Sequence, residues 1–168
     1  MTSTASSPET TTTTGETGTV EFKLEVTTIP VSDVDRAKTF YESLGWRLDA
    51  DFPIRDDFRV IQMTPPGSPT AVIFGRGVTT AEPGSTRAFV LAVQDIEAAR
   101  ADLVARGVDV SGVFHGASGF DLAAAGTDAR QPGPDPERSS YKSWISFSDP
   151  DGNGWLVQEL TTRLPGRE

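Results

Sequence analysis

Cysteine is absent from this chain of 168 residues, and histidine occurs once. The chain therefore forms no disulfide and has no thiolate with which to hold zinc or iron. No apolar run approaches the roughly 18 residues of a membrane-spanning helix, and the first residues contain neither a basic nor an apolar signal region. We expect a soluble, cytoplasmic protein that does not bind membranes.

Positive charge is also scarce, with 15 Lys and Arg against 24 Asp and Glu and a net charge of −9. Binding to the phosphate backbone requires clusters of basic residues, so a nucleic-acid partner is excluded. The acidic surplus has two interpretations. It keeps the surface soluble, or it favours a neutral, weakly cationic or metal-bound ligand.

A stretch of the chain occurs twice. Val31–Ala37 and Val93–Ala99 share the pattern of apolar and acidic positions at an offset of 62 residues, and Gly45 and Gly107 share the same offset. This offset exceeds the periods of roughly 20–50 residues found in solenoids, so we infer two copies of one larger module. A duplicated module offers a pseudo-symmetric cleft where its halves meet, and clefts are where ligands bind.

Each copy predicts a strand, a helix and then further strands. Ser32 or Asp33 is expected to cap the first helix, and the second helix is expected to begin at about Asp95. Gly45 and Gly107 supply the left-handed stop that ends them. The helices are predicted at 33–44 and 95–106, with buried faces formed by Val34, Ala37, Phe40, Tyr41 and Leu44 and by Ile96, Ala99, Leu103 and Val104. The strands are predicted at 20–30, 46–52, 58–64 and 70–75, and at 86–93, 108–114, 141–148 and 154–161.

The domain organisation follows from composition. Residues 1–19 are rich in Thr and Ser without apolar periodicity, which predicts a disordered tail. The stretch 116–140, rich in Gly, Ala, Pro and Asp, is expected to be a lid, a binding loop or a mobile segment. The remaining boundaries are a single domain at 20–162, composed of module one at 20–75, a linker at 76–85 and module two at 86–162, and a C-terminal tail at 163–168.

Two motifs carry a family resemblance. They are Val31–Tyr41 followed by Leu44-Gly45-Trp46, and the segment Phe-Ser-Asp-Pro-Asp-Gly-Asn-Gly-Trp at 147–155. Over residues 20–162 the chain resembles the vicinal-oxygen-chelate superfamily, which includes glyoxalase I, extradiol dioxygenases and bleomycin-resistance proteins. The resemblance implies an α+β fold of two βαβββ modules with curved mixed sheets around a cavity, and it implies a homodimer.

The resemblance also implies metal ligands on the first and last strands of each copy. The first-strand positions fall on Val26 and Ala88, and a last-strand position falls on Leu156. Glu159 reaches that position only if the strand register differs. In copy one, Ala71 and Phe74 are the counterparts of Leu156 and Glu159. Because zinc and iron sites need at least three donors, we expect no metal at the usual site. A divalent metal held by relocated ligands, His115, Glu159 and perhaps Glu25, is the alternative.

The polar candidates each have two interpretations. His115 is an acid–base catalyst or ligand anchor, or it is a loop-edge histidine bonded to its own backbone. Glu159 is a base with a raised pKa in a partly dry cavity, or it faces solvent. Asp135, Arg138 and Tyr141 lie over the cavity if the long loop closes, or belong to a solvated loop.

The candidate ligand-binding residues come from the strands and the loop. Arg59 and Gln62 have opposite parity on one strand, so a regular strand points only one of them inward. The aromatic residues of the strands, Trp144 among them, wall a pocket or form core. The expected set is Trp46, Arg59, Gln62, Phe74, Tyr141 and Trp155, with His115 and Glu159 as catalytic candidates.

Three functions compete. The first is a small-molecule-binding protein without the usual metal ligands, similar to the bleomycin-resistance branch, which sequesters its ligand. The second is a glyoxalase-like lyase or isomerase, or a dioxygenase, that uses non-standard metal ligands or metal-free acid–base catalysis by His115 and Glu159. The third is a structural or partner-binding module. The missing donors at two symmetry-related positions favour the first.

Overall fold

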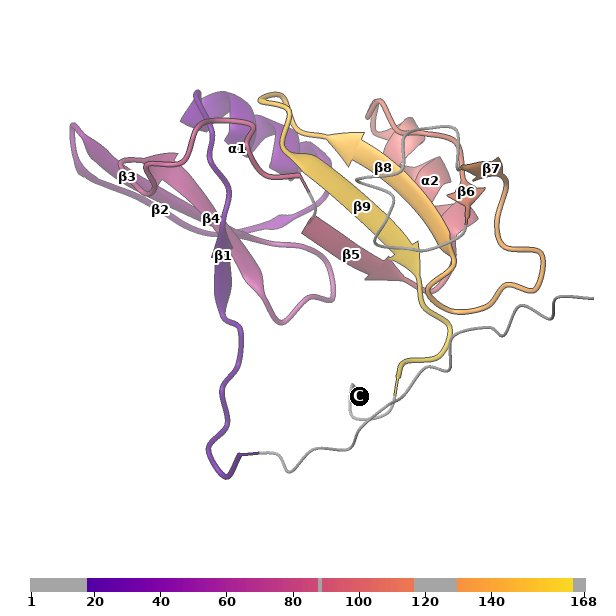
Figure 1. Ribbon diagram of the computed structural model, residues 1–168. Coiled ribbons are helices and arrows are strands. Elements are labelled where there is room, and N and C mark those ends of the chain that lie inside the picture. Colours follow the sequence, from indigo (N-terminus) through magenta and orange to yellow (C-terminus); the bar gives the residue numbers. More distant parts are fainter. Residues whose placement is uncertain (1–17, 88, 117–129, 165–168) are drawn as a thin grey trace, which may run out of the picture.

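Two curved mixed sheets form the body of the molecule, one from each copy of the repeat (Figure 1). The computed structural model describes residues 18–87, 89–116 and 130–164. In module one the sheet order is β1-β4-β3-β2, and β1 runs parallel to β4 while the other pairs are antiparallel. Its elements are β1 (Val26–Thr28), α1 (Val34–Ser43), β2 (Arg47–Arg55), β3 (Phe58–Thr64) and β4 (Ala71–Arg76).

Module two repeats this arrangement and adds a strand. Its sheet order is β5-β9-β8-β6-β7, and β5 runs parallel to β9. Its elements are β5 (Phe89–Val93), α2 (Ile96–Ala105), β6 (Phe114–His115), β7 (Gln131–Pro132), β8 (Ser143–Ser148) and β9 (Gly154–Glu159). The predicted α+β fold of two related modules is confirmed.

The helix ends agree with the sequence predictions. The Asp33 side chain accepts a hydrogen bond from the Arg36 N–H, and the Asp95 side chain accepts from the N–H groups of Glu97 and Ala98. These bonds satisfy N–H groups that have no partner within the helix. Gly45 and Gly107 follow the two helices with φ of 78° and 80°, a conformation that favours glycine.

Several strand predictions were too long. β1 covers only Val26–Thr28, because β1 has a single neighbour, β4, which begins at Ala71. The stretch predicted at 108–114 pairs only through a bridge from Val110 to Phe147 and through β6. β8 begins at Ser143 instead of 141, since Tyr141 has φ of 71°. Val104, predicted to be buried on α2, is exposed.

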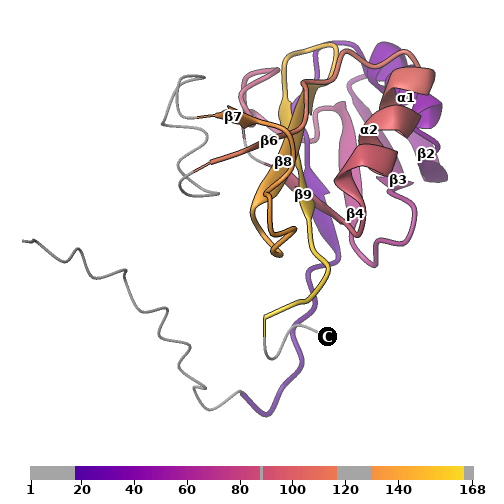
Figure 2. The ribbon, with the colours of Figure 1, turned by 90° about the vertical axis from the view of Figure 1, so that its right-hand side faces the viewer.

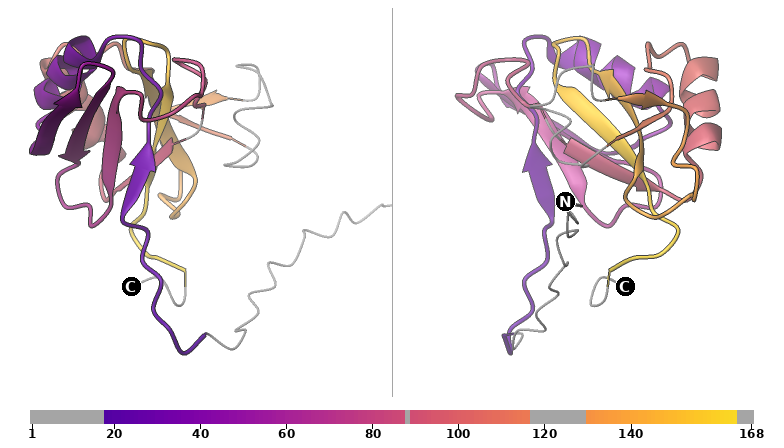
Figure 3. Two further views of the ribbon diagram at one scale, coloured as in Figure 1. Left: turned by 90° about the vertical axis from the view of Figure 1, so that its left-hand side faces the viewer. Right: turned by 45° about the vertical axis from the view of Figure 1, so that its right-hand side comes forward.

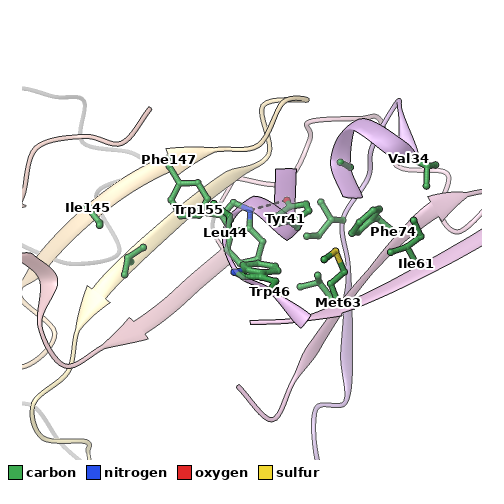
Figure 4. Packing of buried hydrophobic residues seen from close by; sticks show 14 of the residues in the cluster. Val34, Tyr41, Leu44, Trp46, Ile61, Met63, Phe74, Ile145, Phe147 and Trp155 are labelled. Atoms are coloured by element: carbon green, nitrogen blue, oxygen red, sulfur yellow. Dashed lines mark hydrogen bonds between the residues drawn. The ribbon is translucent and has the colours of Figure 1, made fainter. Parts of the chain in front are cut away.

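The core lies between the helices and the sheets and joins both modules (Figure 4). Tyr41 stacks on Trp46 with ring centroids 4.8 Å apart, and Trp46 meets Trp155 edge-on at 5.2 Å. Phe147 also stacks on Trp155. Since these rings come from α1, the start of β2 and two strands of module two, one apolar cluster fixes the modules relative to each other.

A polar network reinforces this junction. The Tyr41 hydroxyl donates to the Asp149 carboxylate at 2.9 Å and accepts from the Trp155 indole N–H at 3.2 Å. Asn153 donates to the Pro30 carbonyl at 2.8 Å, and Asp151 accepts from Arg36 at 2.9 Å. The turn 149–153 therefore connects module two to the start of α1. Burial and the adjacent Asp149 carboxylate raise the pKa of Tyr41, so its hydroxyl stays a donor.

Both helices lie on one side of the molecule (Figure 2). Arg106 at the end of α2 donates to the Ser43 carbonyl at the end of α1 at 3.1 Å. We call the sheet surface under the helices the helix face and the opposite surface the open face. None of the helices in the described part of the chain is long and apolar enough to cross a membrane.

Candidate ligand-binding faces

The open face of module one is mostly apolar. Ile61, Met63 and Phe74 belong to the core on the helix face, so their strand neighbours point to the open face. These neighbours are Val60 and Gln62 on β3 and Ile73 on β4, together with Val26 and Thr28, which pair with Ala71 and Ile73. Gln62 is a polar group on this surface beside the Asp49 carboxylate, and Thr28 adds a hydroxyl on the same face.

The open face of module two is also apolar. Trp155 and Val157 of β9 pack in the core, so Leu156 points the other way. It packs against Trp144 and Phe114, which are both buried. Val90 on the neighbouring strand β5 pairs with Leu156 and is partly exposed. Aromatic and aliphatic side chains therefore underlie this face.

The expected metal-ligand positions do not form a metal site. Val26 and Leu156 point to the open faces, while Ala88 lies outside the described residues. Strand pairing also refines the internal alignment. Thr28 of module one pairs with Ile73. Its counterpart in module two, 62 positions later, is Val90, which pairs with Leu156. Leu156 therefore corresponds to Ile73 and not to Ala71. Neither register supplies a donor, and the described residues contain no group of three His, Asp or Glu that could hold a metal. The usual metal does not fit this chain.

Glu159 lies on the helix face. Its carboxylate is fully buried and accepts from the Ile96 N–H at the start of α2 at 3.1 Å. Arg138 donates to both carboxylate oxygens at 3.1 and 2.5 Å, and a third Arg138 nitrogen reaches Glu97. Both oxygens of Glu159 are thus engaged at a helix N-terminus, where negative charge is favourable. This side chain joins α2, β9 and the segment around Arg138.

His115 lies on β6, between β8 and the edge strand β7. Its Nδ1 lies 2.8 Å from the Gly133 carbonyl, which acts only as an acceptor, so Nδ1 carries the proton. This contact matches the interpretation of a histidine bonded to the backbone of its own loop. Nearby, the Asp135 N–H donates to the buried Ser143 hydroxyl at 3.0 Å.

Arg59 and Gln62 point to opposite faces, as their parity predicts. Arg59 lies on the helix face and donates to Asp51 and Asp35, each at 2.9 Å. The Arg59 and Lys38 cations hold the pKa of Asp51 well below its usual range. Arg59 therefore ties α1 to the β2–β3 hairpin, and of these two side chains only Gln62 lies on the open face.

The aromatic candidates divide between core and surface. Trp46, Phe74 and Trp155 are buried in the core. Tyr141 accepts a hydrogen bond from the Leu164 N–H through its hydroxyl, and its carbonyl accepts from Gln158. Of the six expected ligand-binding residues, the structure brings only Gln62 to an open face by strand alternation.

Two clefts contain the expected residues Trp46 and Trp155 and add others that the sequence did not indicate. A cleft of about 420 Å³ lies between the modules and is lined by Trp46, Leu91, Leu103 and the turn at residues 65–69. A second cleft of about 620 Å³ lies on module two beside Leu156 and is lined by Arg87 and Arg130. Arg87 falls in the strand predicted at 86–93, but β5 begins only at Phe89, and Arg130 lies in an irregular segment where no periodicity reveals the direction of a side chain.

Comparison with known families agrees with this architecture. The model of the glyoxalase/bleomycin resistance protein/dioxygenase superfamily matches residues 23–157. The chain belongs to this superfamily. A search of curated proteins gives no match.

Solved structures show the same fold. The chain is 29% identical to TnmS3, an antibiotic binding protein from Streptomyces sp. CB03234, with a TM-score of 0.62, covering 85% of this chain and 99% of TnmS3. It is 30% identical to a glyoxalase/bleomycin resistance protein from the same organism, with a TM-score of 0.58, covering 82% of this chain and 100% of the other. A superfamily member from Sphaerobacter thermophilus DSM 20745 is 26% identical, with a TM-score of 0.59, covering 83% and 98% of the two chains.

Proposed function

We propose that this superfamily member binds a small organic molecule on its open faces and sequesters it unchanged, without a metal. The observation that carries the proposal is the composition of these faces. Val26, Ile73 and Leu156 present hydrocarbon near the positions where a metal enzyme of this fold needs coordinating atoms. Apolar surface with few polar groups suits an organic ligand, and Gln62 offers one amide to orient it.

The two catalytic candidates support binding over turnover. Glu159 forms an ion pair with Arg138 on the helix face, and His115 bonds to the Gly133 backbone carbonyl. Neither side chain is directed at an open face by a described contact. The likeness to TnmS3, an antibiotic binding protein, supports the same conclusion by analogy.

The protein is proposed to act as a homodimer in the cytoplasm, where a chain without cysteine needs no oxidising environment. The segment before β1 supports the dimer. Val20, Phe22 and Leu24 are 64%, 92% and 72% exposed, and this segment leaves the body of the molecule in both views of Figure 3. β1 and β5 are edge strands with one neighbour each. A second copy of the chain would cover these edges and this apolar row.

Sequestration and catalysis are separated by stoichiometry. The protein is incubated in excess EDTA with bleomycin and with each of a panel of aromatic antibiotics. A sequestering protein protects a sensitive bacterium only up to about one equivalent of ligand per site, and mass spectrometry recovers the bound compound with its mass unchanged. Protection that increases with incubation time, together with a new mass, would assign an enzyme instead.

The dimer is tested by light scattering after size-exclusion chromatography. The full chain is expected at twice its monomer mass, and Phe22→Asp with Leu24→Asp is expected to shift it toward the monomer, because charged side chains replace apolar contacts. A wild-type chain that elutes with the mass of a monomer would contradict this part of the proposal.

A further inference from the structure

Two arginines line the cleft on module two, in a protein whose net charge is −9. Arg87 and Arg130 both line it, and Leu156 connects it to the open face. Within the described part of the chain neither arginine forms a salt bridge to a carboxylate. The cations of this cleft thus have no partner of opposite charge among the residues that the structure describes.

Arg130 is held in a defined position. Its guanidinium carbon lies 4.3 Å from the centre of the Phe114 ring, in a cation–π contact. Its Nε is buried and lacks a hydrogen-bond partner among the described residues. A buried donor on a charged group is costly when unpaired, so this atom indicates a missing acceptor.

Carboxylates also line this cleft and must be counted with the two arginines. Arg87 donates to the Gly152 carbonyl at 3.3 Å, a contact that leaves its positive charge uncompensated. Asp109 is the carboxylate that faces the cleft without a described partner. Asp149 also lines it, but its oxygens accept from Tyr41 and Asn153. These two arginines and two aspartates sum to a formal charge of zero, because hydrogen bonds from the neutral Tyr41 and Asn153 groups do not cancel the charge of Asp149. The unpaired Arg130 donor, and not a net positive charge, is what favours an anion.

We propose that this cleft is the anion-binding part of the ligand site and that the ligand is an apolar aromatic molecule with one carboxylate or sulfonate group. The inference rests on the proposed function, since the aromatic part of the ligand would lie over the open face at Leu156 and Val90. The anionic group would accept hydrogen bonds from Arg87 and Arg130. This anionic ligand class differs from the neutral or cationic ligand that the net charge of the chain led us to expect.

Two fluorescent probes of nearly identical shape test this inference. 1-Anilinonaphthalene-8-sulfonate and N-phenyl-1-naphthylamine share one ring system and differ by the sulfonate. The sulfonate probe is expected to bind the full chain at least tenfold more tightly, since a charge-assisted hydrogen bond contributes about 1.5–3 kcal/mol. Raising the salt concentration should weaken its binding and leave the neutral probe nearly unchanged.

Variants locate the effect. Arg130→Gln and Arg87→Gln are each expected to weaken the sulfonate probe by roughly tenfold and the neutral probe by less than twofold. Arg55→Gln on the β2–β3 hairpin removes the same charge from an exposed pair with Asp57 and should change neither affinity. Circular dichroism confirms that each variant is folded, because partly folded states also bind the sulfonate probe.

The outcomes separate the two proposals. Equal affinity for both probes, or a sulfonate preference that survives both arginine substitutions, overturns the anion-binding inference and leaves the small-molecule site in place. Failure of both probes to bind overturns this inference and contradicts the proposed function as well.

Discussion

Replacing Tyr41 with phenylalanine is expected to lower the free energy of unfolding by about 2–4 kcal/mol. The Tyr41 hydroxyl is buried and makes two hydrogen bonds, one to the Asp149 carboxylate and one from the Trp155 indole. Losing the bond to a charged acceptor costs about 1.5–3 kcal/mol, and leaving a buried N–H unpaired costs about 1–3 kcal/mol. Asp149 keeps the Asn153 side chain and two backbone N–H groups as donors. The expected loss of unfolding free energy is therefore smaller than the sum of the two upper limits.

Urea denaturation followed by tryptophan fluorescence measures this change, since Trp46 and Trp155 belong to the same cluster. The chain's other tyrosine provides the control. Tyr141 accepts a hydrogen bond from the exposed Leu164 N–H, so Tyr141→Phe should cost less than about 1 kcal/mol. If the two substitutions cost the same within error, the polar network does not stabilise the contact between the modules, and this account of the junction is wrong.

Three further predictions concern the helix face and the turns. Arg138→Met should destabilise the fold by about 3–5 kcal/mol in urea, because it leaves the buried Glu159 charge without its cation, and adding Glu159→Gln should recover part of that loss. The depressed pKa of Asp51 means that its ion pairs stabilise the fold at pH values above about 4 and lose this effect as the pH falls. Asp51→Asn should therefore flatten the acid side of a curve of unfolding free energy against pH. A curve unchanged by the substitution would contradict this prediction. Gly84→Ala should cost more than about 2 kcal/mol, because an added Cβ would lie 2.1 Å from the Asp151 carbonyl oxygen. Gly67→Ala should cost only about 1 kcal/mol, because Gly67 has φ of 74° but open space around it. Equal melting temperatures for the two variants would refute this difference.

The elements with strong local signals could be predicted from the sequence. Of the two caps expected for the first helix, Ser32 and Asp33, the structure uses Asp33; the second helix starts at its cap, Asp95, as expected, and β3 has the predicted bounds. The cap and the glycine stop act within a few residues, so they can be recognised locally. Strand lengths could not be predicted equally well. β1 is short because its length depends on how far β4 extends, and that partner lies more than 40 residues away.

The site was harder to predict for a different reason. Alternation along a strand separates two faces but does not say which one a helix covers. Trp155 was therefore expected either in the pocket or in the core, and the structure places it in the core. The partner of Glu159 is Arg138, 21 positions earlier in an irregular segment, where no periodicity gives its direction. Arg130 was missed for the same reason.

The central claim is that the open face binds an organic molecule without a metal, and one binding measurement tests it most directly. Val90 and Val104 are both exposed valines, at 42% and 49%, but Val90 lies on the open face of β5 and Val104 on α2. Titration of N-phenyl-1-naphthylamine in excess EDTA should give saturable binding to the wild-type chain and to Val104→Arg, and binding weakened at least tenfold in Val90→Arg. Binding that requires added metal, or that is lost equally in both variants, would contradict the account.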